Sequence, residues 1–481
     1  MTSEKKKKIL LIHPLGVNWM PGETDMSRIA NIMPPIGLCS LAAWVERRGH
    51  RADIHDCYAF PGQDAQIDRY IQTEAPDFVG FSATTSSFLD GARIARHIKE
   101  AHPKIRTVFG GVHVSALRER LMRDFPEIDY AIPGEGEGPL LALLESNGED
   151  PAAIPGLIFR DGEEVKSAEG KSEALDLDDL PFPAYGKLRG FPQSYKLPIF
   201  NYPKAPGATA VTSRGCPYQC SYCDRSVFGR SFRFNSAGYM AELLRHLHQT
   251  FGIRHVTFYD DNFTVNHARV VEFCERMTRA RLPMTFSCAV RAEHVDRDLL
   301  RLMKRAGCWM ISFGVESGDP DLLARHRSPA DLDMIRERIG WVKEAGIRAK
   351  GLFMLGLPGE TEETIERSMA YALSLPLNEF NLAKFTPFPG SPLYKNIGDH
   401  GTFEEDWELM NCLNFVFMPH GLTRERLEER YREFYRRYFQ RPSVLLGYAA
   451  MLWRSPDSWV RFLRNWKDFM RLRAAYKKTR Q

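Results

Sequence analysis

The sequence has no long apolar run. No window reaches the roughly 18 to 20 consecutive apolar residues that a membrane-spanning helix needs. The apolar residues 9–12, which follow lysines 5–8, are too few for the hydrophobic core of a secretion signal. We therefore expect a protein that stays in the cytoplasm.

A disulfide pattern and a strong charge of one sign are missing as well. The nine cysteines are odd in number, and their distribution, six scattered and three clustered, is typical of a reduced compartment. The net charge of +4 in 481 residues says little about partners. Hydrophobic residues make up 43%, which is enough to bury real cores, and the length predicts roughly two to four domains.

Three cysteines, Cys216, Cys220 and Cys223, lie on a loop rich in turn residues. Three thiolates are one ligand too few for a closed zinc site, but they can hold a [4Fe-4S] cluster and leave one of its irons free. A zinc knuckle would need a fourth ligand, and the next candidates, His246 and His248, fall in a predicted helix. Buried free thiols are the other alternative, and the loop fits them poorly. We interpret the cysteines as cluster ligands.

The spacing C-x3-C-x-aromatic-C, with Tyr222 in the aromatic place, resembles that of the radical SAM enzymes. Similar enzymes carry further recognisable segments, which fall here at residues 258–263, 314–318 and 356–361, so the resemblance covers roughly residues 205–395. In that family the free iron binds S-adenosylmethionine, and the reduced cluster cleaves it to methionine and a 5′-deoxyadenosyl radical. The resemblance therefore implies S-adenosylmethionine as cosubstrate and an electron donor such as flavodoxin or ferredoxin.

Residues 1–148 predict a separate α/β domain. Its short apolar runs are bounded by turn residues and separated by segments with helical periodicity, a pattern typical of buried parallel strands. We expect a doubly wound, flavodoxin-like sheet, on which ligands bind beyond the carboxyl ends of the strands. The expected strands are residues 9–12, 52–54, 78–81, 107–109 and 130–132.

Several residues after these strands are candidates for cofactor binding. Glycines there let the backbone approach a flat or phosphate-bearing ligand, although any single one could serve only to fold a tight turn. Together with the Met-Pro-Pro-Ile-Gly-Leu segment at residues 33–38, the pattern resembles the cobalamin-binding domain that precedes the radical SAM core in a large enzyme subclass. The candidates are Ser82, Thr84, Gly110, Gly111, His113, Gly134 and Glu135.

One departure concerns the lower ligand of cobalt. Many cobalamin proteins carry D-x-H-x-x-G after the first strand, but this chain has His-Pro-Leu-Gly at residues 13–16. His55 imitates half of the motif at the wrong strand, and we interpret it as structural. A methylthiotransferase would need three cysteines for a second cluster before the core, whereas only Cys39 and Cys57 precede residue 216.

Residues 149–206 predict a linker with a hairpin at 157–165, and residues 207–397 predict a partial (β/α)6 barrel. Reactive groups sit at the carboxyl ends of barrel strands, and the cysteine loop follows the first strand expected, residues 210–212. The other strands expected are residues 255–259, 285–290, 310–315, 349–355 and 379–384. The residues expected at their carboxyl ends are Asp260, Asp261, Arg291, Glu316 and Gly356.

Ligand chemistry and the resemblance suggest roles for these residues. Glu316 would accept the ribose hydroxyls, Asp260 or Asp261 would take the ammonium group, and Arg291 would pair with the methionine carboxylate. Tyr222 would form an aromatic wall near the adenine. Solvated or salt-bridged side chains are the alternative for each Asp or Arg. Family members often have Asn-Lys where this chain has His-Arg at residues 326–327. The chain therefore departs from the family pattern on the substrate side of the site.

Residues 398–481 predict a helical, basic C-terminal region. Residues 424–481 contain 16 Lys or Arg against 6 Asp or Glu. We expect a basic amphipathic helix that either caps the barrel with a solvated face or lies on an anionic membrane surface. No nucleic-acid recognition motif is present. The apolar residues at near-helical spacing are Trp453, Trp459, Phe462, Leu463, Trp466, Phe469, Met470 and Leu472.

The sequence therefore predicts a cobalamin-dependent radical SAM enzyme with three cofactors: a [4Fe-4S] cluster, S-adenosylmethionine and cobalamin. We favour methyl transfer to an unactivated carbon. Oxidative ring formation, as in the anaerobic porphyrin-ester cyclases, is one alternative, and a non-catalytic corrinoid-binding sensor is another. The expected substrate is a small molecule, a lipid or a tetrapyrrole.

Overall fold

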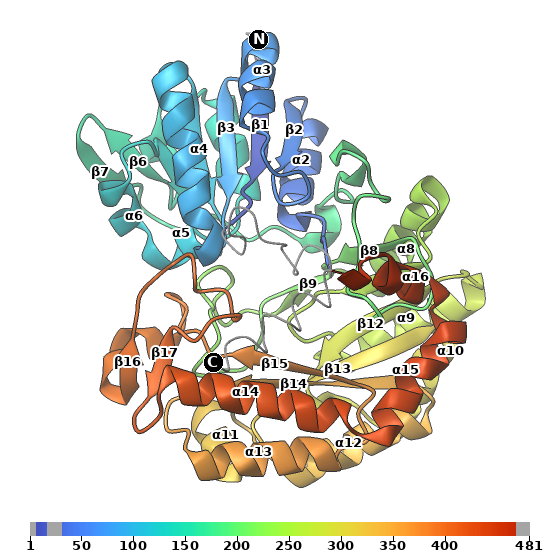
Figure 1. The fold of residues 1–481 in the computed structure, drawn as a ribbon. Coiled ribbons are helices and arrows are strands. Elements are labelled where there is room, and N and C mark those ends of the chain that lie inside the picture. Colours follow the sequence, from blue (N-terminus) through green and yellow to red (C-terminus); the bar gives the residue numbers. More distant parts are fainter. Residues whose placement is uncertain (1–5, 17–30, 468–481) are drawn as a thin grey trace.

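The computed structural model describes residues 6–16 and 31–467. Two α/β parts face each other: an N-terminal sheet with its helices, blue to teal in Figure 1, and an open parallel barrel, green to orange. Three C-terminal helices pack along the barrel. The predicted fold class is confirmed, since the first sheet carries a B12-type α/β arrangement and the second is a half-barrel of six parallel strands.

The N-terminal sheet has seven strands in the order β2-β1-β3-β4-β5-β6-β7. All five predicted strands are present and parallel. The predicted hairpin also forms, but it pairs antiparallel with β5 and extends this sheet, because β5 would otherwise be an unpaired edge. The strands are β1 (Lys8–His13), β2 (Arg51–Asp56), β3 (Phe78–Ser82), β4 (Arg106–Gly110), β5 (Tyr130–Ile132), β6 (Ile158–Asp161) and β7 (Glu164–Ser167).

Helices cover both faces of this sheet. Side chains of β1 alternate between two hydrophobic clusters, with Ile9 and Leu11 in one and Leu10 and Ile12 in the other, as the two-residue period of a strand requires. The first cluster includes α2 (Ile36–Arg47) and α7 (Glu137–Glu145). The second includes α3 (Asp64–Glu74), α4 (Phe88–Ala101), α5 (Val112–Leu117) and α6 (Glu119–Asp124).

The half-barrel has six parallel strands in the order β15-β14-β13-β12-β11-β8. The first strand begins earlier than expected and ends at Ala210, because the backbone N–H of Thr212 donates to the Asp260 carboxylate and not to a neighbouring strand. The strands are β8 (Gly207–Ala210), β11 (His255–Phe258), β12 (Thr285–Val290), β13 (Cys308–Glu316), β14 (Arg348–Leu355) and β15 (Glu379–Lys384). The helices are α8 (Ala237–Phe251), α9 (His267–Ala280), α10 (Arg297–Arg305), α11 (Pro320–His326), α12 (Leu332–Glu344) and α13 (Glu362–Ser374).

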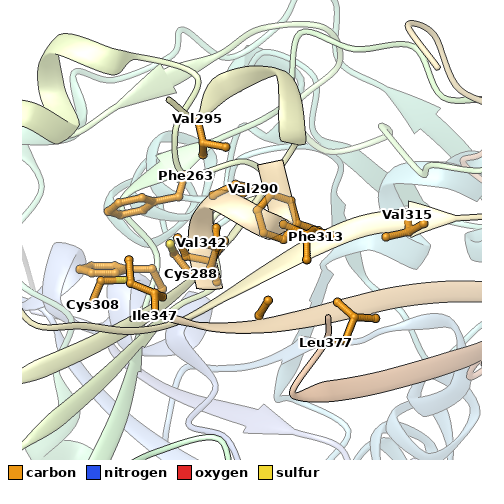
Figure 2. Close-up of a cluster of buried hydrophobic side chains, with 14 of the residues drawn as sticks. Phe263, Cys288, Val290, Val295, Cys308, Phe313, Val315, Val342, Ile347 and Leu377 are labelled. Carbon is orange, nitrogen blue, oxygen red and sulfur yellow. The ribbon is translucent and has the colours of Figure 1, made fainter. Parts of the chain in front are cut away.

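Apolar side chains fill the space between these strands and helices. Figure 2 shows Cys288 of β12 and Cys308 of β13 among Phe263, Phe313 and Val342. Both thiols are buried, and burial raises the pKa of Cys288 well above its ordinary value. These scattered cysteines therefore pack as small apolar residues of the barrel core.

The C-terminal region forms three helices where one amphipathic helix was expected. These are α14 (Arg424–Phe439), α15 (Pro442–Arg454) and α16 (Pro456–Arg464). The expectation of one helix was wrong because a proline lacks the N–H of a continuing helix and favours its first position, where Pro442 and Pro456 stand. Phe469, Met470 and Leu472 lie outside the described residues. No helix within residues 6–16 and 31–467 is long and apolar enough to span a membrane.

The basic residues of α14 are paired and not simply solvated. Arg426 and Arg430 bond to Glu362 at the start of α13, and Arg437 Nη1 lies 2.6 Å from Glu366 Oε1. Because α13 carries acidic side chains within reach of these arginines, the positive charge of α14 helps to hold this helix against the barrel.

Candidate functional site

A cavity of about 340 Å³ lies between the two parts of the molecule. One wall comes from the carboxyl ends of β3, β4 and β5, and the opposite wall comes from the segment after β8 and from the end of β11. The connecting segment contributes Leu177 and Leu180. Most of the lining side chains are apolar, so a bound group would be shielded from water.

Five of the residues predicted to bind cobalamin line this cavity: Ser82, Gly110, Gly111, Gly134 and Glu135. Thr84 lines a smaller hollow of about 150 Å³, which Ser82 and Gly111 also border. Gly111 has φ +99°, and a Cβ there would lie 2.7 Å from the carbonyl oxygen of Ala83. Only glycine fits such a position, so Gly111 allows the ends of β3 and β4 to approach each other closely. This open, glycine-lined edge fits the approach of a flat ring.

The structure places His113 away from the cavity. Its side chain is completely buried, with Nδ1 3.2 Å from Thr85 Oγ1 and the ring centroid 4.5 Å from that of Trp407. Burial, with a contribution from the Arg120 charge, lowers the pKa of His113 to about 3. His113 is therefore neutral and packs as an aromatic residue.

His13 belongs to the segment at residues 13–16 discussed above but is not among the predicted cofactor-binding residues. It ends β1, lines the smaller hollow beside Thr84, and places Nδ1 2.9 Å from Asp56 Oδ1. The Asp56 carboxylate is buried and also accepts a hydrogen bond from the Tyr195 hydroxyl at 3.0 Å. This network fixes the ring, so Nε2 is the nitrogen left to meet a ligand. The signal was missed because Asp56 lies on another strand.

The cysteine loop begins directly after Arg214. Gly215 has φ +84°, and a Cβ there would overlap the carbonyl oxygen of Ser231, so the loop starts at a position that requires glycine. Cys220 is buried, Cys216 is half-buried and Cys223 is exposed.

Cys220 is prepared to act as a thiolate. A hydrogen bond from the Cys223 thiol lowers the pKa of Cys220 against the opposing effect of burial, with help from the Tyr222 hydroxyl and the Arg291 charge, and the same bond raises the pKa of Cys223. The Arg291 Nη1 atom lies 3.5 Å from Cys220 Sγ. Within the described residues, no three His, Cys, Asp or Glu side chains converge as ligands of a single metal ion. Thiolates spread along a loop suit a cluster, in which each binds a different iron.

The adjacent residues Asp260 and Asp261 face different surroundings. Asp260 is buried and accepts from Thr212 N at 2.6 Å and from Thr212 Oγ1 at 2.7 Å. Both carboxylate oxygens of Asp260 are therefore occupied by Thr212, which follows the first strand. Asp261 lines the cavity and is accessible from solvent. Partial desolvation of its carboxyl group and the neighbouring Asp260 charge raise its pKa.

Arg291 and Glu316 lie beside the cysteine loop. The Arg291 guanidinium stacks over the Tyr218 ring at 3.7 Å and bonds to Glu293 at 3.1 Å. Burial raises the pKa of Glu316 to about 7, while the Arg327 charge and a hydrogen bond from Tyr222 oppose that rise. The Glu316 carboxyl group therefore titrates near neutral pH, and it is hydrogen-bonded to Tyr222, the aromatic residue of the cysteine motif.

Other motif residues hold the backbone in place. The Gly356 N–H donates to the Glu360 carboxylate, whose pKa burial raises to about 8. His326 bonds to Ser221 at 2.8 Å through Nδ1 and to the Pro358 carbonyl at 2.7 Å through Nε2. His326, expected to concern the substrate side, therefore ties the cysteine loop to the segment after β14.

Charged residues join the two walls of the cavity. Arg214 bonds to both Glu135 and Glu137, and Arg233 bonds to Glu135. The Arg214 and Glu137 side chains are largely shielded from water. This link could not be predicted from the sequence, because its partners lie far apart along the chain. Its one signal was a pair of acidic residues at 135 and 137, at the end of a strand.

Comparisons with known families match both parts of the chain. The profile of the Radical SAM superfamily matches residues 210–372, and that of the B12 binding domain matches residues 23–144. An uncharacterized methyltransferase of Pyrococcus horikoshii is 29% identical over 447 residues, which cover 92% of this chain and 94% of that protein. The anaerobic magnesium-protoporphyrin IX monomethyl ester cyclase of Rubrivivax gelatinosus is 27% identical over 451 residues, or 91% of this chain and 78% of the cyclase.

Solved structures share the fold. The radical S-adenosylmethionine methyltransferase TsrM from Kitasatospora setae, with cobalamin and a [4Fe-4S] cluster bound, has a TM-score of 0.65 at 20% identity, over 81% of this chain and 77% of TsrM. The cobalamin-dependent radical enzyme OxsB, with aqua-cobalamin and S-adenosylmethionine bound, has a TM-score of 0.70 at 16% identity, over 89% of this chain and 66% of OxsB. The order of the two parts along the chain and their joint fold thus recur in these proteins.

Proposed function

Because this chain is a radical SAM enzyme with a B12-binding domain, we propose that it transfers a methyl group to an unactivated carbon. One observation carries the proposal: a mostly apolar cavity is lined by the B12-binding domain on one side and, on the other, by residues that follow the first two barrel strands, among them Arg214 and Asp261. A methyl donor held by one domain would there meet a substrate activated by the other. Distant relatives are named as methyltransferases, which supports this choice.

When bound, the cluster and S-adenosylmethionine supply a hydrogen-abstracting radical, and cobalamin supplies the methyl group. Cys216, Cys220 and Cys223 would hold the cluster. The glycine-lined strand ends at Gly110 and Gly111 would seat the corrin ring. The apolar lining limits the access of water and solutes to the reacting groups, which restricts side reactions.

Four residues of the barrel would orient the cosubstrate. We propose Asp261 for the ammonium group, since Asp260 already accepts two hydrogen bonds from Thr212. Arg291 would pair with the methionine carboxylate, and Glu316 would accept the ribose hydroxyls. Tyr222 would flank the adenine. Each of these roles is carried by position at a strand end and by ligand chemistry.

Oxidative cyclisation is the second candidate function. The specific observation that favours it is the similarity to anaerobic magnesium-protoporphyrin IX monomethyl ester cyclases from several organisms, which extends over most of this chain. Relatives named for tetrapyrrole and hopanoid substrates indicate which compounds to try first.

We propose a cytoplasmic enzyme that takes electrons from a flavodoxin or a ferredoxin.

The deciding experiment is an anaerobic assay with reconstituted enzyme, reduced flavodoxin, cobalamin and S-adenosylmethionine labelled in its methyl group. Tetrapyrrole and hopanoid candidates are offered, and product mass is recorded. A labelled product heavier by one methylene equivalent supports methylation, whereas loss of hydrogen with uptake of oxygen supports the cyclase.

Cys220→Ala provides the matched control for that assay. It should abolish either reaction, because the cluster loses one of three ligands. Cys274→Ala, which changes a buried thiol on α9, should leave activity near the wild-type level. Full activity in Cys220→Ala would overturn both enzymatic proposals and favour a corrinoid-binding sensor.

A further inference from the structure

The helices α15 and α16 expose an unusual number of large apolar side chains. We call these side chains the apolar face; they are Leu445, Leu446, Leu452, Trp453, Val460, Leu463 and Trp466. Trp453, Leu446 and Leu463 are the most exposed large apolar side chains in the described part of the chain, at 81%, 70% and 61%. Soluble proteins rarely expose a continuous apolar surface unless it binds something.

The apolar face is built into regular helices and is not a loose loop. On α15, the adjacent pair Leu445 and Leu446 lies about two helical turns before the adjacent pair Leu452 and Trp453, so all four share one side. The opposite side holds the buried Val444 and Met451. An ordinary surface helix turns a polar side toward water, but α15 is apolar on both sides.

Contacts behind the face hold the two helices firmly. Trp459 Nε1 donates to the Tyr448 carbonyl at 3.3 Å, and the Phe200 ring stacks edge-on against both Tyr448 and Trp459. Arg461 Nη1 donates to the Leu197 carbonyl at 2.7 Å. The apolar face is therefore a rigid platform, fixed to the segment that leads into the barrel.

The charges around the face are positive. Arg454, Arg464 and Lys467 are exposed on the same two helices or just after them. Asp457 is the one acidic residue between 442 and 467, and it accepts a hydrogen bond from the Tyr202 hydroxyl at 2.6 Å.

From this combination we propose that the apolar face docks the enzyme on an anionic lipid bilayer. Leucine and tryptophan would enter the boundary between headgroups and acyl chains, where the amphipathic indole ring is favoured. The basic rim would meet the negative surface potential of anionic lipids. A symmetric contact with a second copy fits less well, since it would bring the basic rims of both copies together.

The test is flotation of the reconstituted full-length enzyme with vesicles. Vesicles of phosphatidylcholine with about 30% phosphatidylglycerol are compared with pure phosphatidylcholine. We expect binding to the anionic vesicles to be stronger by about tenfold or more, and to weaken as salt is raised. Absence of binding to the anionic vesicles, or equal binding to both compositions, would overturn the proposal.

Variants separate the face from the rest of the surface. Leu446→Gln with Trp453→Gln should reduce binding by about tenfold or more, since both side chains would be inserted. Leu413→Gln, at a side chain that is 50% exposed outside the two helices, is the matched control and should bind as wild type does. Cluster content and circular dichroism verify that each variant is folded.

Sedimentation velocity tests the competing occupant. Suppose that wild type is a dimer and does not bind vesicles, whereas the double variant is a monomer. That result would assign the apolar face to a second copy and overturn the lipid proposal. A monomer that floats with anionic vesicles supports it. The inference stands on α15 and α16 alone, so it can hold even if the proposed reaction is wrong.

Discussion

Arg214 Nη1 lies 3.2 Å from Glu137 Oε2, across the boundary between the two domains. Arg214 also stands directly before Gly215, where the cysteine loop begins. One ion pair therefore connects the strand ends of the B12-binding domain to the loop that carries the proposed cluster ligands. The cavity lies between these two structures.

We expect Arg214→Ala to weaken the contact between the domains. Loss of one partner leaves the largely buried Glu137 carboxylate without its counter-charge, which typically costs about 3 to 5 kcal/mol for buried pairs. Retention of cobalamin during gel filtration should fall about tenfold or more, with iron content near the wild-type level. Arg276→Ala, which removes an exposed pair with Glu272, is the control and should change neither quantity. Unchanged cobalamin retention in Arg214→Ala would show that the pair does not hold the domains together.

Gly215→Ala should prevent assembly of the cluster. A methyl group at this position would overlap the Ser231 carbonyl, and φ +84° is strained for any residue with a Cβ. Iron and sulfide analysis after anaerobic reconstitution should show a large loss. Gly229→Ala is matched in backbone, with φ +62°, but its Cβ meets open space. If both variants load iron equally, the start of the loop is less constrained than its geometry indicates.

Glu360 should make stability depend on pH. Burial raises its pKa from 4.5 to about 8, so the folded state favours the neutral carboxyl. The contribution of Glu360 to the free energy of unfolding is fully present below pH 4.5. It is lost as pH rises through about 8, by on the order of 1.4 kcal/mol per pH unit. Relative to wild type, Glu360→Gln should therefore be most stabilised at pH 8.5 and least at pH 5.5.

Thermal unfolding of the two proteins at both pH values measures this difference. Glu272→Gln, at an exposed residue of α9, serves as the control and should show no such trend. A Glu360→Gln protein whose Tm follows the wild-type pH profile would refute the raised pKa.

Trp407→Ala should loosen residues 404–416, a segment after the barrel that packs against the B12-binding domain through Trp407. The Trp407 ring packs 4.5 Å from His113 and 5.7 Å from Phe88 of that domain. Because Trp407 is only half-buried, the loss should be smaller than the roughly 3 to 5 kcal/mol of a fully buried tryptophan. Faster proteolysis between residues 404 and 416 is the measurement, and Trp453→Ala on the exposed face of α15 is the control. Equal cleavage rates in all three proteins would show that Trp407 does not anchor the segment.

The strands of both sheets could be predicted from local pattern. Short apolar runs at residues 9–12 and 78–81 indicated buried strands because apolar periodicity reflects burial directly. The cysteine spacing at Cys216, Cys220 and Cys223 indicated the cofactor class, since ligand type and spacing determine which metal group can bind. These features depend on residues near one another in the chain.

The sequence by itself thus determined the two α/β parts, their order and the cofactors of the enzyme. Only the tertiary structure decided which side chains face the cavity: Asp261 does, whereas Asp260 bonds to Thr212 and His113 packs against Trp407. It also decided that the hairpin extends the first sheet and that Arg214 meets Glu137. The physical reason is that orientation and pairing depend on contacts between residues far apart in the chain, which local periodicity does not encode.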